Sequence, residues 1–235
     1  MATKISACRF LVTTKSQPLS RVRRLLKALE TPYRQAGPAC FSFGMAIPNS
    51  FTINVTRLNH IPCHANDDIR KFAQENGDSM YHVRCATLSN MQFRNAIQHT
   101  HPFVAHDRYL FLHNGNIPRL NNDPKKTDSE EFFDQWLRSM TALDKSTSPS
   151  LQSLMKNYEM DDILLNVVML DVETGELVAY SHPDESGDLP PIFFDEGLGI
   201  LTNFRAFKKQ RPLPPGHILL RPNFRQSYVT LPLNS

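Results

Sequence analysis

The spacing of apolar residues along the chain predicts many short strands interleaved with a few helices. Short apolar runs bounded by polar, Gly or Pro residues are typical of strands. They occur at 8–13, 41–47, 51–58, 80–86, 109–113, 163–170, 176–180, 192–194, 199–202, 217–220 and 227–231. Helical spacing or helix-start signals mark 18–31, 66–75, 127–137 and 148–158. Because neighbouring strands form hairpins, the pattern predicts an α+β fold of antiparallel sheets covered by helices.

Local signals set the expected ends of the helices. Thr31-Pro32 should end the first helix, because the residue before a proline is disfavoured in the α conformation. Thr127 and Glu130 have the spacing of a capping box at the start of the third. Ser148 should cap the last, with proline at the first helical position.

Composition indicates an ordinary globular protein. With 235 residues and 40% apolar content, the chain can bury a sizeable core, and we expect a single domain. A net charge of +3 does not by itself indicate nucleic acid, and the basic residues of the first helix are more typical of a solvated helix face. No apolar run approaches the roughly 20 residues that a membrane span needs. Four cysteines without a C-x-x-C pair favour reduced thiols, so we expect a cytoplasmic protein with neither nucleic acid nor membrane as a partner.

The stretch 80–117 has the highest density of reactive and polar side chains. Arg84 lies in a predicted buried strand, where its guanidinium needs an anionic partner, either a structural salt bridge or a ligand carboxylate. Asn114-Gly115 tolerates positive φ, so it can close a hairpin. The same pair can direct an amide side chain and a backbone N–H toward one point, which makes it a candidate oxyanion hole.

Two further residues are candidates for acyl-transfer chemistry. Cys8, at the start of the first strand, is either a small buried core residue or a nucleophile. Asp128, at a helix start, is favoured there by the helix dipole alone, yet it can also bind an ammonium group. Together with Arg84 and Asn114-Gly115 they form the set that an acyl-transfer site needs.

A metal site and a nucleotide site are the alternatives to this hypothesis. Several residues between 60 and 113 are of types that bind zinc, but they do not have a recognised zinc spacing. They are His60, Cys63, His64, His99, His101, His106 and His113. No Gly-rich phosphate loop follows a strand. A zinc hydrolase therefore remains an alternative, and we expect no metal and no cofactor.

Six segments in order resemble the motifs of the class II glutamine amidotransferases, which are N-terminal-nucleophile (Ntn) hydrolases. The likeness is to small stand-alone members similar to the ergothioneine-pathway and glutathione-degrading amidohydrolases. The segments are Cys-Arg-Phe-Leu at 8–11, His-Val-Arg-Cys-Ala-Thr at 82–87, Thr-His-Pro-Phe at 100–103, His-Asn-Gly-Asn-Ile at 113–117, Thr-Asp-Ser-Glu at 127–130 and Leu-Pro-Pro-Gly-His-Ile-Leu-Leu at 213–220. The family's Asp-Gly-Trp-Gly block is replaced by 40–46, where Gly44 is the clear match.

The resemblance implies a fold and a set of roles. The fold is a four-layer αββα sandwich of two antiparallel sheets. Cys8 would be the nucleophile that forms a thioester from glutamine or a γ-glutamyl amide, and Asn114 and Gly115 would bind the oxyanion. Arg84 and Thr87 would bind the substrate α-carboxylate, and the carboxylate of Asp128 its α-ammonium.

The position of Cys8 adds one condition to these roles. In the family the nucleophile is the first residue of the mature chain, and its α-amine, with a pKa of about 7.7 to 8.0, acts as the general base. Residues 1–7 precede Cys8 here, so we expect them to be an extension or propeptide and 8–235 to be the amidotransferase domain. The alternative is a catalytically silent binding or complex-forming subunit. Small-molecule substrates are expected, and any use of the released ammonia would need a partner chain.

Overall fold

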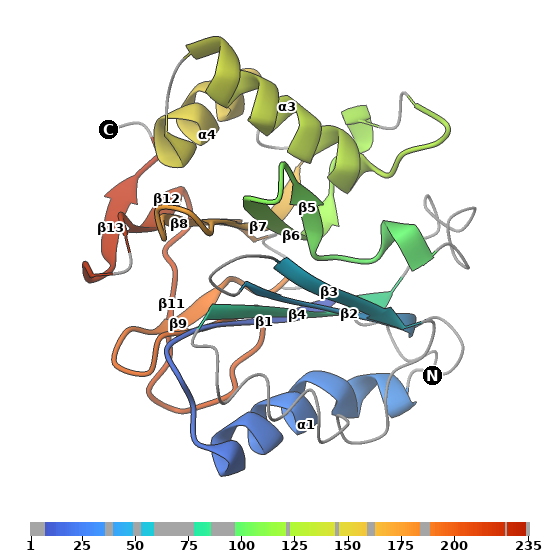
Figure 1. Ribbon diagram of the computed structural model, residues 1–235, viewed down its shortest axis with the longest axis vertical. Coiled ribbons are helices and arrows are strands. Elements are labelled where there is room, and N and C mark those ends of the chain that lie inside the picture. Colours follow the sequence, from blue (N-terminus) through green and yellow to red (C-terminus); the bar gives the residue numbers. More distant parts are fainter. Residues whose placement is uncertain are drawn as a thin grey trace. The chain divides into compact units, whose positions relative to one another are not determined.

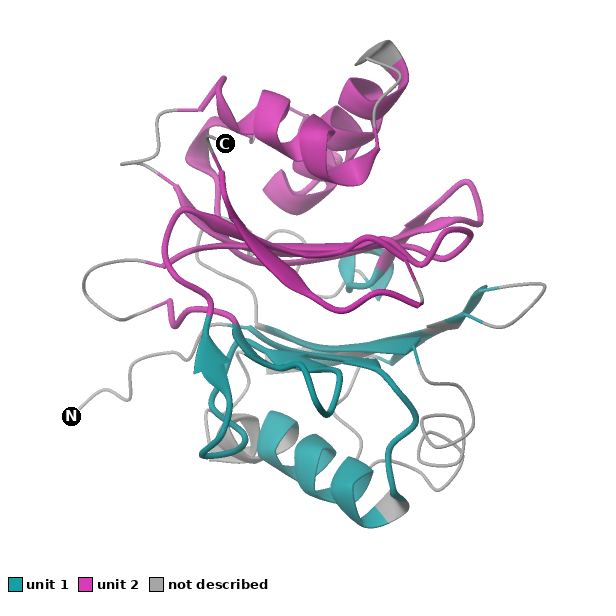
Figure 2. Cartoon of the chain, turned by 90° about the vertical axis from the view of Figure 1, so that its left-hand side faces the viewer, with its two compact units in different colours: residues 1–102, 193–212 teal, residues 103–192, 213–235 magenta. Residues whose placement is uncertain are grey.

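The computed structural model describes ten stretches of the chain. These are residues 8–35, 40–48, 53–58, 78–85, 97–120, 123–143, 146–158, 163–183, 189–223 and 225–233. The chain divides into two compact units (Figure 2). Unit 1 comprises 1–102 and 193–212, and unit 2 comprises 103–192 and 213–235. Each unit has one antiparallel sheet and its own helices, which confirms the predicted α+β class with two antiparallel sheets.

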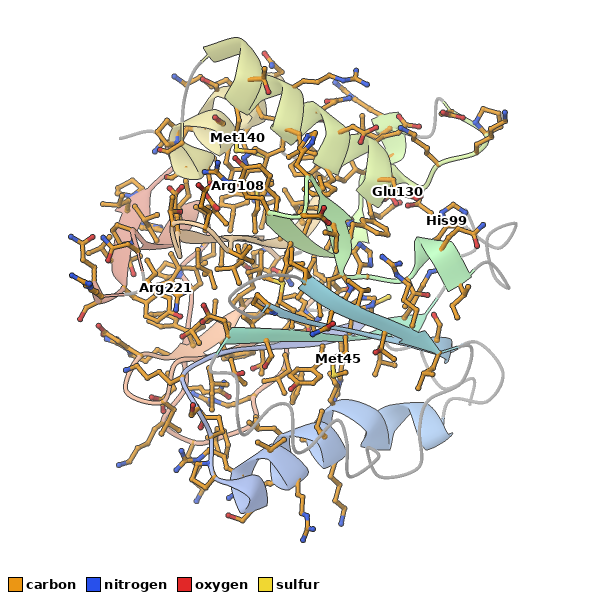
Figure 3. All side chains as sticks on the ribbon, viewed as in Figure 1. Met45, His99, Arg108, Glu130, Met140 and Arg221 are labelled. Atoms are coloured by element: carbon orange, nitrogen blue, oxygen red, sulfur yellow. The ribbon has the colours of Figure 1, made fainter. Side chains whose placement is uncertain are left out.

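Unit 1 is a seven-stranded sheet with one long helix on one face (Figure 1). The strand order is β11-β9-β10-β1-β4-β2-β3. The bounds are β1 (Arg9–Thr14), β2 (Cys40–Pro48), β3 (Ile53–Leu58), β4 (Asp78–Cys85), β9 (Phe193–Asp195), β10 (Ile200–Thr202) and β11 (Arg211–Pro212), with helix α1 (Leu19–Gln35) and the 3-10 turn η3 (Ile97–His99). Leu11, Met45 and Tyr81 are paired across β1, β2 and β4, and they pack with the apolar side chains of α1. Met45 is labelled in Figure 3.

The first helix continues past the position where the sequence predicts its end. α1 runs to Gln35, so the expected termination at Thr31 is wrong. Pro32 has no N–H to donate to the carbonyl of Ala28 four residues earlier. The Arg9 guanidinium donates to that carbonyl instead, with Nη1 3.0 Å from the oxygen. A side chain from β1 therefore compensates for the hydrogen bond that the proline removes.

Unit 2 is a six-stranded sheet with two helices on one face (Figure 1). The strand order is β13-β12-β8-β7-β6-β5. The bounds are β5 (Phe103–Ala105), β6 (Tyr109–Asn116), β7 (Leu164–Asp171), β8 (Leu177–His182), β12 (His217–Arg221) and β13 (Val229–Pro232), with η4 (Pro118–Leu120), α3 (Asp128–Leu143) and α4 (Thr147–Met155). Phe111, Trp136 and Met140 belong to the apolar core that joins these helices to the sheet. Met140 is labelled in Figure 3.

The two helix starts in unit 2 differ in how well the sequence predicts them. The capping box at α3 is confirmed: the Thr127 N–H donates to Glu130 Oε2 at 2.8 Å, and the Glu130 N–H donates to Thr127 Oγ1 at 3.3 Å. The predicted cap of α4 at Ser148 is wrong. The N-cap is Ser146, which makes no side-chain capping bond. The carboxylate of Glu176 accepts the first N–H of α4 at 3.1 Å, so a distant residue replaces the local cap.

Most of the predicted strands are present. The predicted hairpins over 41–58 and 163–180 correspond to the antiparallel pairs β2–β3 and β7–β8. β5 and β11 are strands that the sequence pattern did not predict. The helix predicted at 66–75 lies outside the described residues.

Candidate active site

Cys8 lies directly before β1, and its backbone is fixed by a residue of unit 1 that is distant in sequence. The thiol residue is half-buried and packs against the apolar cluster beneath α1. Asn203 Nδ2 donates to the Cys8 carbonyl at 2.7 Å, and the Phe10 N–H donates to Asn203 Oδ1 at 2.8 Å. Asn203 is 1% exposed. Both sides of Arg9 are therefore held by one buried side-chain amide.

Arg84 comes close to Cys8 through strand pairing. β1 and β4 are antiparallel, and their register ends with Arg9 opposite Val83, the neighbours of Cys8 and Arg84 in sequence. On its other side, Arg84 is paired with Ser42 of β2, and both residues are buried. Unit 1 therefore brings together the predicted nucleophile and one predicted carboxylate ligand. Thr87, the other predicted carboxylate ligand, lies outside the described residues.

The Thr-His-Pro segment at 100–102 is fastened to the same part of the sheet. The Thr100 hydroxyl donates to Ser42 Oγ at 2.8 Å, and Arg57 donates to the carbonyls of Thr100 at 2.8 Å and Pro102 at 2.9 Å. A Cβ at Gly44 would lie 1.7 Å from the carbonyl oxygen of His101. Gly44 is thus the residue that allows this segment to approach β2.

A pair of buried histidines lies in this region. The rings of His82 and His101 meet edge to face, with their centroids 4.6 Å apart. They are 0% and 5% exposed, respectively. In the described ranges no group of three or more His, Cys, Asp and Glu side chains could hold a metal ion. Of the zinc-ligand candidates, His60, Cys63 and His64 lie outside those ranges.

In unit 2, Asn114 and Gly115 do not close a hairpin as predicted. They belong to β6, where they are paired with Asn166 and Leu165 of β7. The prediction is wrong because the residue pair that tolerates positive φ is used inside a strand. Gly115 has φ +153°, and an added Cβ would lie 1.8 Å from the Leu164 carbonyl oxygen. Glycine is therefore required here both by the backbone conformation and by the close approach of β7.

The amide of Asn114 is buried without a partner for its donor. The residue is 3% exposed, and Nδ2 has no hydrogen-bond partner within the part of the chain that the structure describes. Leaving a buried donor unpaired costs about 1–3 kcal/mol. Such a group in a native structure calls for an explanation, and a ligand acceptor is one.

Asp128 begins α3 and is bound to the strand that carries Asn114. Its Oδ2 accepts the Ile117 N–H at 3.0 Å, and its Oδ1 accepts the Ser129 N–H at 2.9 Å. These bonds fasten the helix start to the end of the His-Asn-Gly-Asn-Ile segment. Unit 2 therefore brings together the predicted oxyanion donors and the predicted ammonium ligand.

His113 is buried on the opposite side of β6 from Asn114, because consecutive strand residues alternate between faces. Its Nδ1 is 2.7 Å from Ser129 Oγ. Burial lowers the pKa of the imidazole below its ordinary value, and the negative charge of Asp128 opposes this only in part. A neutral His113 thus links β6 to the start of α3.

The chain is similar to two solved structures over nearly its whole length. One is the allosteric regulatory enzyme of purine biosynthesis, with a TM-score of 0.69 and 14% identity; the match covers 96% of this chain and 49% of that chain. The other is a glutamine aminotransferase class-II domain protein from Silicibacter pomeroyi, with a TM-score of 0.55 and 16% identity, covering 96% and 99%. The chain has the class II glutamine amidotransferase fold. This confirms the fold that the ordered motifs predicted.

Other comparisons set the limits of that statement. No protein-family model and no curated protein matches the sequence. The chain spans about half the length of the first amidotransferase-fold structure, so the activity of that whole enzyme is not carried over. None of the helices in the described ranges is long and apolar enough to cross a membrane.

Sequence patterns did not identify several residues that bind the predicted motif segments. Asn203, Ser42 and Arg57 each bind a backbone or side-chain group of a motif segment. Asn203 follows the predicted strand 199–202, and a polar residue at that position is an ambiguous local signal. Their partners lie far away in the sequence, so no short-range pattern could have identified them.

Proposed function

We propose that the chain is a glutamine amidotransferase-like amidohydrolase that cleaves glutamine or a γ-glutamyl amide through a thioester on Cys8. The observation that best supports this proposal is the buried Asn114 Nδ2 without a hydrogen-bond partner among the described residues. An asparagine that served only packing would have its donor paired. A developing oxyanion would accept a hydrogen bond from this donor and from the Gly115 N–H.

The proposed reaction has two steps. The Cys8 sulfur attacks the amide carbon of the substrate side chain, while the thiol proton passes to the α-amine of Cys8. The tetrahedral oxyanion collapses, the C–N bond breaks, and the nitrogen leaves with that proton as ammonia or an amine. Water then attacks the thioester, the C–S bond breaks, and glutamate and the thiol are released.

The remaining predicted residues would select the amino-acid end of the substrate. Arg84 and Thr87 would bind the α-carboxylate, for which a planar guanidinium is suited. Asp128 would bind the α-ammonium. Its carboxylate accepts the backbone N–H groups of Ile117 and Ser129 and the Ser129 hydroxyl, and these bonds hold it at the start of α3.

The α-amine can act as a base only if the bond between Ala7 and Cys8 is broken, because an amide nitrogen cannot take the proton. The proposal therefore includes removal of residues 1–7, with 8–235 as the amidotransferase domain. It also includes a cytoplasmic location, since a reducing compartment keeps the Cys8 thiol available. If the ammonia is used in synthesis, a partner chain would bind the acceptor.

A second candidate function is a catalytically silent subunit that retains the amino-acid site. It is favoured by the peptide bond that joins Ala7 to Cys8 in the encoded chain. In this case the chain would bind glutamine or a γ-glutamyl compound without releasing glutamate.

One experiment separates the two functions. Glutamate release is measured for the encoded chain and for a chain cleaved to begin at Cys8, with glutamine and with γ-glutamyl amides, and intact mass records the terminus. We expect release only from the cleaved chain. Cys8→Ala should reduce it by about 10³-fold or more without unfolding the protein.

Two results would decide against the enzyme. Unchanged release in Cys8→Ala would exclude Cys8 as the nucleophile. A folded, cleaved chain that binds glutamine but releases no glutamate would establish the silent subunit.

A further inference from the structure

Asn203 makes two hydrogen bonds that a strand would otherwise make. β10 pairs with β1 as far as Thr202 opposite Leu11, and Asn203 is the next residue along the chain. The side-chain amide of Asn203 continues the pairing. It accepts the N–H of Phe10 at 2.8 Å and donates to the carbonyl of Cys8 at 2.7 Å.

This arrangement fixes Cys8 without using its nitrogen. The two bonded groups are the carbonyl of Cys8 and the N–H two residues later, on the same edge of the strand. Chain termini are poorly ordered unless they are tied down. If Cys8 becomes the first residue, its α-nitrogen must remain available as a base, so its carbonyl has to carry the attachment.

We propose that Asn203 is the positioning residue of the nucleophile, and that its side-chain amide holds the terminal Cys8 in place through the carbonyl of Cys8 and not through its α-amine. This inference rests on the proposed function. Asn203 acts through Cys8 and does not contact the reacting atoms. Its loss should therefore slow the chemical step without weakening the attachment of substrate to Arg84 and Asp128.

The test uses one matched pair of variants. Asn203→Asp keeps the acceptor for Phe10 but removes the donor to Cys8. Gln210→Glu makes the same amide-to-acid change in the same loop, at a residue that is also 1% exposed. The hydrogen bonds of the Gln210 side chain go to the hydroxyl of Thr202 and to the N–H groups of residues 206 and 207. Asn203→Leu removes both bonds without burying a charge, and it serves if Asn203→Asp does not fold.

Two quantities are measured for each variant. In the chain cleaved before Cys8, Asn203→Asp should lower kcat for glutamine by on the order of 10²-fold, since a displacement of about 1 Å costs this much, and KM should stay within about twofold. In the encoded chain, which needs no activity, alkylation of Cys8 by iodoacetamide is followed by peptide mass. We expect alkylation to become several-fold faster, because the half-buried thiol is less firmly held. Gln210→Glu should leave both quantities unchanged.

The outcomes distinguish this inference from the proposed function. If the wild-type cleaved chain releases no glutamate, the activity proposal fails, while faster alkylation in Asn203→Asp alone would still support positioning. If Asn203→Leu is folded and matches the wild type in both kcat and alkylation rate, the positioning role is wrong. It is equally wrong if Gln210→Glu changes both quantities as much as Asn203→Asp does.

Discussion

Comparison of three glycines separates two contributions to the stability that is lost when Gly115 is substituted. One is the positive φ, and the other is the close contact with the neighbouring strand. At Gly197 an added Cβ would meet Asp195 Oδ1 at 3.4 Å, an ordinary contact, and φ is not positive. At Gly216, φ is +69° and nothing lies within 4 Å of the added atom. At Gly115, φ is +153° and the Cβ would lie 1.8 Å from the Leu164 carbonyl oxygen and 2.6 Å from its carbon.

Substitution of each glycine by alanine should give a graded loss of stability. Gly197→Ala should be neutral or stabilising by up to about 1 kcal/mol, because alanine reduces the entropy of the unfolded chain. Gly216→Ala should cost about 1 kcal/mol from its conformation alone. Gly115→Ala should cost about 3 kcal/mol or more. Here the Leu164 carbonyl oxygen would lie 1.8 Å from the added Cβ, and it would have to move until the two atoms are at least 3.0 Å apart.

Urea denaturation gives the free energy of unfolding of all three variants, fitted with one common slope m against urea concentration. Glutamate release by the cleaved chain should also fall in Gly115→Ala and remain in the other two. If Gly115→Ala is no less stable than Gly216→Ala, the close approach of β7 to β6 does not constrain this position. The reason given for glycine in the strand would then be incorrect.

Two further predictions concern residues outside the proposed chemistry. Arg9→Met should lower the free energy of unfolding by about 1–3 kcal/mol, because the Ala28 carbonyl loses its donor. The control Arg23→Met, on the exposed face of α1, should change the free energy of unfolding by less than about 0.5 kcal/mol. Thermal and urea unfolding of both variants test this prediction. Burial lowers the pKa of His113 in the folded protein. As the pH falls below about 6.5, His113 is therefore protonated in the unfolded chain before it is protonated in the folded one. The free energy of unfolding should decrease between pH 7 and 5, and by more in the wild type than in His113→Asn.

Local patterns predicted most of the strands and one helix start, because those features depend on neighbours in sequence. The capping box at Thr127 is such a case. The errors share a different cause, since in each of them a distant group supplies what the local sequence lacks. Pro32 leaves the Ala28 carbonyl without its helical donor, and Arg9 of β1 donates to that carbonyl. Glu176, from the turn between β7 and β8, caps the start of α4.

The candidate site shows the same division. Ordered motifs predicted Cys8, Arg84 and Asn114 as functional residues, because a resemblance compares the whole chain at once. Strand pairing then explains why the segments that carry Cys8 and Arg84 are neighbours in unit 1. The role of Asn203, which is 195 residues from Cys8, depends on β10 ending one residue earlier, and that end is a property of the folded sheet.

These contacts also decide which observations bear on catalysis. The Cys-Arg-Phe segment makes structural hydrogen bonds that a silent subunit would need as well. Arg9 donates to the Ala28 carbonyl of α1, and Asn203 binds the backbone on both sides of Arg9. The presence of this segment therefore does not separate an enzyme from a binding protein. Asn114 is different, because its buried donor has no structural partner among the described residues and is costly to retain. Asn114→Leu should accordingly leave stability unchanged or raise it, and a clear loss of stability would show that the amide serves the fold and not a ligand.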